Sequence, residues 1–234
     1  PAVTPATAKR WLDQGFDDNG RPVVILDTRN DYEVDEGTFK GAIDWRLTKF
    51  TEFPDALKAH KEELQDKTII SFCTGGIRCE KASAYYKHKG FKNVFQLEGG
   101  IIEYTRQVEK KGLENKFIGK NFVFDERLGE RITDEIIAKC HQCGSPADTH
   151  TNCANDACHL LFIQCDACKT TFENCCSSDC QEITHLSEED QKALRKGKTV
   201  SNLIFRKGRS EKLLYQQHKE KPVSLIAMNK QKDK

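Results

Sequence analysis

A cluster of cysteines constrains this chain more than any other feature. Nine of its eleven cysteines lie within residues 140–180, and two Cys-x-x-Cys pairs occur among them. A two-residue spacer lets both thiolates reach one metal ion, so repeated pairs are typical of tetrahedral zinc sites. Disulfide frameworks suit small secreted domains, whereas this chain has 234 residues and shows no secretory signal pattern. The cluster therefore indicates a small metal-stapled module.

Eight of these nine cysteines can form two metal sites. One cysteine of the adjacent pair Cys175 and Cys176 is then not a ligand. The expected ligands are Cys140, Cys143, Cys153, Cys158, Cys165, Cys168, Cys176 and Cys180. The simplest partition assigns the first four to one site and the last four to the other, and an interleaved arrangement is equally compatible with the spacing. A histidine (His141, His150 or His159) can replace a thiolate. Disulfides, unligated thiols or an iron–sulfur cluster are the alternatives to structural zinc.

The N-terminal half alternates short apolar runs with helical segments. We expect strands over residues 23–27, 68–72 and 93–97, and a fourth candidate spans 41–45. We expect helices over residues 4–14, 54–64, 80–89 and 101–110. Unbroken apolar runs suit strands that are covered on both faces. Their alternation with helices predicts an α/β fold, a parallel sheet with helices on both faces.

One loop of this half has the composition of a nucleophile site. Cys73 stands directly after the second strand and before a helical segment, at the sheet edge where ligands bind in open α/β folds. Such a loop gathers backbone amides and the positive end of a helix dipole, and Arg78 adds a positive charge. These surroundings lower the pKa of a thiol, so Cys73 and Arg78 are the candidate catalytic residues. The remaining loop residues are Thr74, Gly75, Gly76 and Ile77.

The spacing within this loop resembles that of the rhodanese family. Arg78 follows Cys73 by five residues, one fewer than in phosphatase loops of this design, so we expect a guest smaller than phosphate. Cys73, Gly76 and Arg78 match the Cys-x-x-Gly-x-Arg pattern of single-domain rhodaneses, and residues 26–43 resemble the stretch between their first two strands. Thr38 departs from the histidine that many rhodaneses carry. The resemblance implies a persulfide on Cys73 held by loop amides.

The same resemblance suggests roles for residues near the loop. Asp27 and Arg29 flank the site in rhodanese-like domains, so they are candidate flanking residues; the alternatives are a loop cap for Asp27 and an ion pair for Arg29. Cys79 directly follows Arg78. We expect it to point into the core, and a resolving role toward Cys73 is the alternative.

Charge and hydropathy divide the chain into three parts. The formal net charge is +1, yet residues 191–234 contain 13 Lys or Arg against three acidic residues. Such a segment can hold an anionic partner such as RNA, or can be a solvated terminus. We expect a rhodanese-like domain over residues 1–124, a linker and cysteine-rich module over 125–185, and a basic tail over 186–234. No apolar run is long enough to span a bilayer, so we expect no membrane association.

The reactive loop and the cysteine cluster together resemble the bacterial tRNA uridine 5-hydroxylase family. The resemblance spans nearly the whole chain and implies a cytoplasmic oxidoreductase that converts the wobble uridine of tRNA to 5-hydroxyuridine. It implies O2 as co-substrate and the anticodon region of tRNA as partner, with no DNA, and it leaves the electron donor open. Family members carry an N-terminal domain before the rhodanese unit, so we expect this chain to be a fragment. The alternatives are a persulfide sulfurtransferase and a non-enzymatic, zinc-stapled adaptor for RNA or protein.

Overall fold

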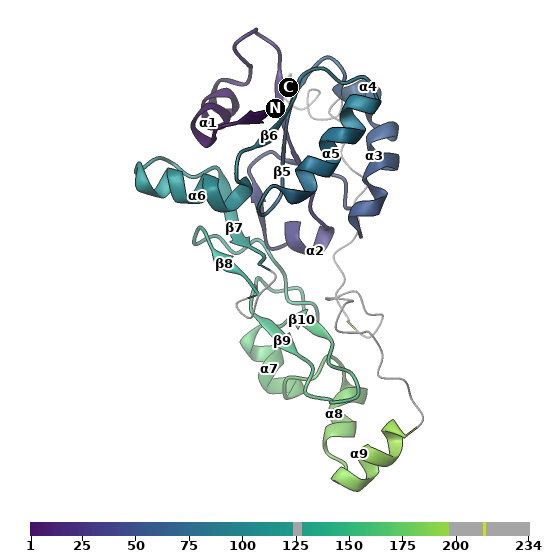
Figure 1. Cartoon of the computed structure of the whole chain (residues 1–234). Coiled ribbons are helices and arrows are strands. Elements are labelled where there is room, and N and C mark those ends of the chain that lie inside the picture. The colour runs from purple at the N-terminus through teal and green to yellow at the C-terminus, as the bar shows by residue number, and fades with distance from the viewer. Residues whose placement is uncertain (124–127, 197–212, 214–234) are drawn as a thin grey trace, which may run out of the picture. The chain divides into compact units, whose positions relative to one another are not determined.

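The computed structural model describes residues 1–123, 128–196 and 213, which fall into two compact units (Figure 1). The first unit extends to Glu135, and the second begins at Ile136. Most of the predicted basic tail, with its apolar runs at 202–205 and 223–228, lies outside the described residues. Within the described residues, no helix is both long enough and apolar enough to cross a membrane.

A five-stranded parallel sheet forms the centre of the first unit, with the strand order β1-β6-β5-β2-β4. The strands are β1 (Ala2–Val3), β2 (Val23–Asp27), β4 (Ile43–Asp44), β5 (Thr68–Phe72) and β6 (Val94–Leu97). The predictions for 23–27 and 68–72 are confirmed with the same bounds, and the other two expected strands are shorter than predicted. The two-residue β1 was not predicted, because so short an element has no readable periodicity.

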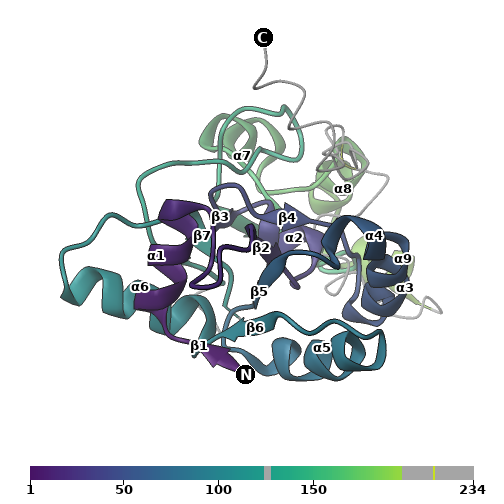
Figure 2. The same cartoon turned by 90° about the horizontal axis from the view of Figure 1, so that it is seen from above.

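Helices cover both faces of this sheet, as predicted (Figure 2). On one face lie α1 (Pro5–Gln14) and α6 (Gly100–Lys110), and on the other lie α3 (Phe53–Ala59), α4 (Lys61–Leu64) and α5 (Ile77–His88). Successive side chains of a strand point to opposite faces. Accordingly, Ile70 of β5 packs with Trp11 and Tyr104 in one core, while its neighbour Ile69 packs in the other with Tyr86.

Two short helical elements and a second sheet complete the first unit. The short helix α2 (Asp31–Val34) follows β2, and the 3-10 turn η1 (Phe50–Glu52) follows β4. A second, antiparallel sheet has the order β3-β7-β8, formed by β3 (Gly37–Phe39), β7 (Phe117–Asn121) and β8 (Glu130–Arg131). The sequence did not predict this sheet, because its strands are short and lack a continuous apolar run.

The second unit is built around its cysteines. It contains the hairpin of β9 (His150–Asn152) and β10 (Leu161–Ile163), followed by α7 (Asp166–Phe172), α8 (Ser178–Thr184) and α9 (Glu188–Arg195). One of its two buried clusters contains Leu160, Phe162 and five cysteines. The other contains two further buried cysteines. A segment with so few large apolar residues has little other core, so its cysteines must contribute much of its stability.

Candidate functional site

Cys73 lies in the loop between β5 and α5, at the carboxyl end of a central strand. Only 2% of the residue is exposed. The amide of Gly76 donates a hydrogen bond to Cys73 Sγ over 3.0 Å, and Gly76 adopts a φ of 96°, in the region that favours glycine. Helix α5 begins at Ile77, three residues earlier than predicted. The first amides of a helix have no intrahelical partner, so an early start brings free donors next to the sulfur.

These surroundings favour the thiolate form of Cys73. A hydrogen bond from the Cys79 thiol, the positive charge of Arg78 and the backbone amides of both residues lower the pKa of Cys73 to about 5, against the opposing effect of burial. The pKa of Cys79 is raised well above its usual range by the same contact with Cys73 and by its own burial. Cys79 is fully buried, as predicted, and its sulfur lies 3.7 Å from Thr28 Oγ1. The arrangement therefore favours the thiolate form of Cys73 beside the thiol form of Cys79.

Arg78 is bound to a residue that the sequence analysis missed. Its Nη1 and Nη2 donate to the two carboxylate oxygens of Glu33 over 2.5 and 2.8 Å. Glu33 lies on α2 and is fully buried, and its carboxylate also accepts the amide of Asn30 over 3.0 Å, which forms a capping box. The Asn-x-x-Glu spacing signals such a cap in the sequence, but nothing in it links Glu33 to Arg78.

Asp27 and Arg29, the candidate flanking residues, are buried. Arg29 Nε and Nη2 donate to the Asp27 carboxylate over 2.9 and 2.7 Å, and neither residue exposes more than 1% of its surface. Phe72 and Phe117 lie against the Arg29 guanidinium, each with its ring centroid 5.7 Å away. Thr38 donates its hydroxyl to Asp27 over 2.8 Å. The pair is thus buried, and it contacts Phe72, the residue that precedes Cys73.

The other loop residues differ in exposure. Ile77 is the most exposed large apolar residue among those that the structure describes, at 71%. A Cβ on Gly75 would meet no atom within 4 Å. The amide of Ile102 on α6 donates to the carbonyl of Thr74 over 3.2 Å, which ties that helix to the loop.

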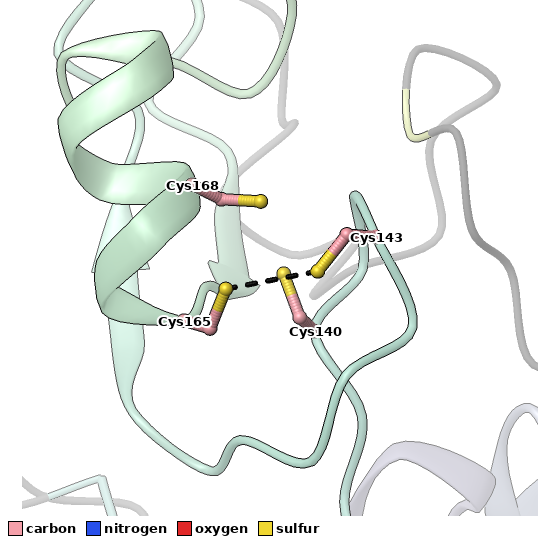
Figure 3. A group of neighbouring side chains, drawn as sticks. All are labelled: Cys140, Cys143, Cys165 and Cys168. Carbon is pink, nitrogen blue, oxygen red and sulfur yellow. Dashed lines mark hydrogen bonds between the residues drawn. The ribbon is translucent and has the colours of Figure 1, made fainter.

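The cysteine-rich unit brings all eight predicted ligands into two groups. The first contains Cys140, Cys143, Cys165 and Cys168, whose side chains converge from a loop and from the start of α7 (Figure 3). The second contains Cys153, Cys158, Cys176 and Cys180. Within each group, the sulfur atoms all lie within 4.8 Å of one another. The structure therefore has the interleaved arrangement, and the simplest partition, which took the ligands four by four along the chain, is wrong.

The sulfur positions fit single tetrahedral ions. The distance between two sulfurs is 3.7 Å for Cys143 and Cys165, and the same for Cys176 with Cys158 and with Cys180. A tetrahedron with zinc–sulfur bonds of about 2.3 Å has edges of about 3.8 Å. The candidate substitutes His141, His150 and His159 belong to neither group, and Cys175 is the buried cysteine that is left over.

Two buried glutamines lie between these groups. Gln142 stands between Cys140 and Cys143, and Gln164 directly precedes Cys165. Gln164 Nε2 donates to Gln142 Oε1 over 2.8 Å, and Gln142 Nε2 donates to the carbonyl of Cys175 over 3.0 Å. These bonds connect both ligand pairs of the first group to the segment that carries Cys176, a ligand of the second.

Comparison with known proteins finds two consecutive family matches, the second of which begins within the first unit. Residues 5–107 match the rhodanese-like domain family, and residues 118–181 match the family described as rhodanase C-terminal. A Yersinia enterocolitica protein named tRNA uridine(34) hydroxylase is 56% identical over 187 residues, which are 80% of this chain and 53% of that protein. An Enterobacter protein of the same name is 55% identical over the same shares. The chain thus spans about half the length of the curated relatives it matches.

Solved structures are also among the matches. The crystal structure of a rhodanese-like domain protein from Staphylococcus aureus is 25% identical, covering 44% of this chain and 89% of that one, with a TM-score of 0.35.

Proposed function

We propose that this chain, which is similar over 80% of its length to proteins named tRNA uridine(34) hydroxylase, acts in the oxygen-dependent hydroxylation of the wobble uridine of tRNA to 5-hydroxyuridine. The observation that carries the proposal is the Cys73 loop, in which an amide, a neighbouring thiol and a guanidinium favour a thiolate. A cytoplasmic site of action follows from tRNA as substrate.

In this proposal Cys73 acts as a covalent catalyst. Its thiolate adds to C6 of the uracil ring, a sulfur–carbon bond forms, and the electron pair of the C5–C6 double bond makes C5 nucleophilic toward an oxidant. Loss of the C5 proton after oxidation expels the thiolate and restores the double bond. Hydroxylation with O2, in which the second oxygen atom leaves as water, requires two electrons from an external reductant. The protonated Cys79 thiol and the loop amides stabilise Cys73 when it is expelled as a thiolate.

The test is nucleoside mass spectrometry of tRNA from cells that lack the gene. We expect the wild-type gene to restore 5-hydroxyuridine and the Cys73→Ser gene to restore none. The matched control is Cys175→Ser, which removes a buried thiol outside both cysteine groups and should restore the product. Normal product with Cys73→Ser would rule out the covalent role.

A persulfide sulfurtransferase is the second candidate, because the same loop can hold the outer sulfur of a persulfide. Incubation with thiosulfate followed by intact-mass measurement would then show a gain of one sulfur atom at Cys73. Transfer of that sulfur to an acceptor, without any effect on tRNA nucleosides, would favour this function. An adaptor role predicts instead that Cys73 is dispensable while chelation abolishes binding.

For the two cysteine groups we propose structural Zn²⁺. Four thiolates at tetrahedral spacing suit this ion, which supplies folding energy and has no redox chemistry. Structural zinc contributes about 10–16 kcal/mol of apparent free energy in small zinc-finger peptides. The oxidation step therefore does not depend on either ion.

For tRNA we propose a contact through the basic tail. Its excess of Lys and Arg over acidic residues suits phosphate neutralisation, which makes affinity fall steeply with salt. Removing residues 191–234 should flatten the salt dependence of tRNA affinity in filter binding. An unchanged slope would place the RNA contact elsewhere.

A further inference from the structure

The charged residues behind the reactive loop form a neutral set. Asp27, Arg29, Glu33 and Arg78 contribute two charges of each sign, and the first three are buried to 99% or more. Arg29 interacts electrostatically with Glu33 and Arg78 as well as with Asp27. The positive charge of Arg78 is therefore balanced inside the protein before any guest arrives.

Glu33 holds Arg78 by both terminal nitrogens of its guanidinium. The two bonds, of 2.5 and 2.8 Å, run to different carboxylate oxygens, the bidentate geometry that an arginine would otherwise offer to an anionic guest. The Asn30 amide fixes the same carboxylate from the helix cap. A guest at Cys73 thus meets a guanidinium that is paired with a buried carboxylate and whose two terminal nitrogens are already engaged.

This arrangement affects guests of different charge unequally. Because the charges of these four residues sum to zero, the Cys73 thiolate adds a net negative charge to the set. A dianion such as thiosulfate is repelled by that charge and finds no free guanidinium, whereas an uncharged ring suffers no such repulsion. The effect is large where charges are partly removed from water.

We infer that Glu33 is a specificity-determining residue. By pairing with Arg78 it makes the Cys73 loop favour an uncharged electrophile, such as a pyrimidine ring, over an anionic sulfur donor. The inference rests on the proposed function in one respect, that Cys73 is the nucleophile. It goes further because it states that a buried carboxylate on α2, that of Glu33, determines which class of substrate the loop accepts.

Two alkylating reagents test this inference on the full chain. Iodoacetamide is neutral and iodoacetate is anionic, and both react with the same thiolate. The ratio of their rates at Cys73, followed by mass spectrometry of the peptide that contains it, is therefore independent of the thiolate fraction. We expect Glu33→Gln to raise the iodoacetate/iodoacetamide ratio about tenfold, as for one unit charge removed nearby, and Arg78→Met to lower it.

Matched variants separate charge from folding. Glu33→Asp keeps the charge and should keep the wild-type ratio. Glu103→Gln breaks an exposed bidentate pair with Arg106 on α6 and should leave the ratio unchanged. A ratio that stays constant in Glu33→Gln, or that rises equally in Glu33→Asp, would overturn the inference.

Thiosulfate provides a second readout. In persulfide formation the outer sulfur of thiosulfate bonds to the Cys73 thiolate and sulfite leaves. This reaction should require at least about tenfold less thiosulfate in Glu33→Gln than in the wild type, because thiosulfate carries two negative charges and iodoacetate one. The failures of the two proposals are distinguishable. If Cys73 reacts no faster than an ordinary thiol in any variant, the proposed nucleophile is wrong. If Cys73 is reactive but Glu33→Gln changes neither the iodoacetate/iodoacetamide ratio nor the thiosulfate requirement, only the present inference is wrong.

Discussion

Gly100 lies directly against the backbone of Cys73. A Cβ on Gly100 would come within 2.5 Å of the Cys73 carbonyl oxygen and 2.6 Å of the Thr74 carbonyl oxygen. The next amide, that of Ile101, donates to the same Cys73 carbonyl over 3.0 Å. The start of α6 therefore supports the reactive loop from behind, and no side chain fits between them.

Gly100→Ala should disturb the reactive loop. Gly100 has a φ of 64°, so alanine there is strained in addition to clashing with two carbonyl groups. We expect slower alkylation of Cys73 and a loss of stability of about 2 kcal/mol or more, measured by urea unfolding. Gly112→Ala is the matched control, because Gly112 has a φ of 60° and open space around it. Equal effects of both substitutions would show that the close contact is unimportant.

The reactivity of Cys73 should follow its lowered pKa. With a pKa of about 5, the thiol is ionised at neutral pH, so its alkylation rate should be flat above about pH 6 and fall as pH drops through 5. An unperturbed cysteine would instead titrate near pH 8.5. Arg78→Met removes a charge that favours the thiolate, so the midpoint should move to higher pH. Rates of iodoacetamide labelling at the Cys73 peptide measure this, and a wild-type midpoint near 8.5 would contradict it.

Asp27→Asn should act mainly on stability. The change leaves the Arg29 guanidinium buried without its counter-charge, which costs about 3–5 kcal/mol. Urea unfolding followed by tryptophan fluorescence suits the measurement, because both tryptophans of the chain, Trp11 and Trp45, lie in the first unit. Asp18→Asn, which breaks an exposed pair with Arg10, should cost less than about 1 kcal/mol. A small effect of Asp27→Asn would mean that the pair contributes little to the fold.

Adjacent cysteines provide a matched test of the metal sites. Cys176 belongs to the second group, whereas Cys175 is outside both. Elemental analysis of the purified chain should find two zinc ions in the wild type and in Cys175→Ser, and one fewer in Cys176→Ser. Three remaining thiolates bind zinc more weakly than four, and the hydroxyl of serine is a poor substitute. Equal zinc in the two variants would contradict the assignment of Cys176.

Local patterns were enough to predict the central strands of the first unit and the helices beside them. The runs at 23–27 and 68–72 form the strands expected of them, and the helix expected over residues 4–14 forms as α1. The position of Cys73 between a strand and a helix followed from the same signals. Each depends on residues close together in the chain, whose conformational preferences act before any tertiary contact forms.

The sequence by itself determined the kind of fold, the reactive loop and the identity of the eight clustered thiols. Only the tertiary structure decided which partners these residues have. Glu33 reaches Arg78 across 45 positions, and Cys143 meets Cys165 across 22, while Cys153, nearer in the chain, joins the other group. Spacing limits which ligands can share an ion, but the hairpin of β9 and β10 and the helices after it bring distant pairs together. Pairings of this kind depend on how packed elements meet in space, and a single sequence does not record that.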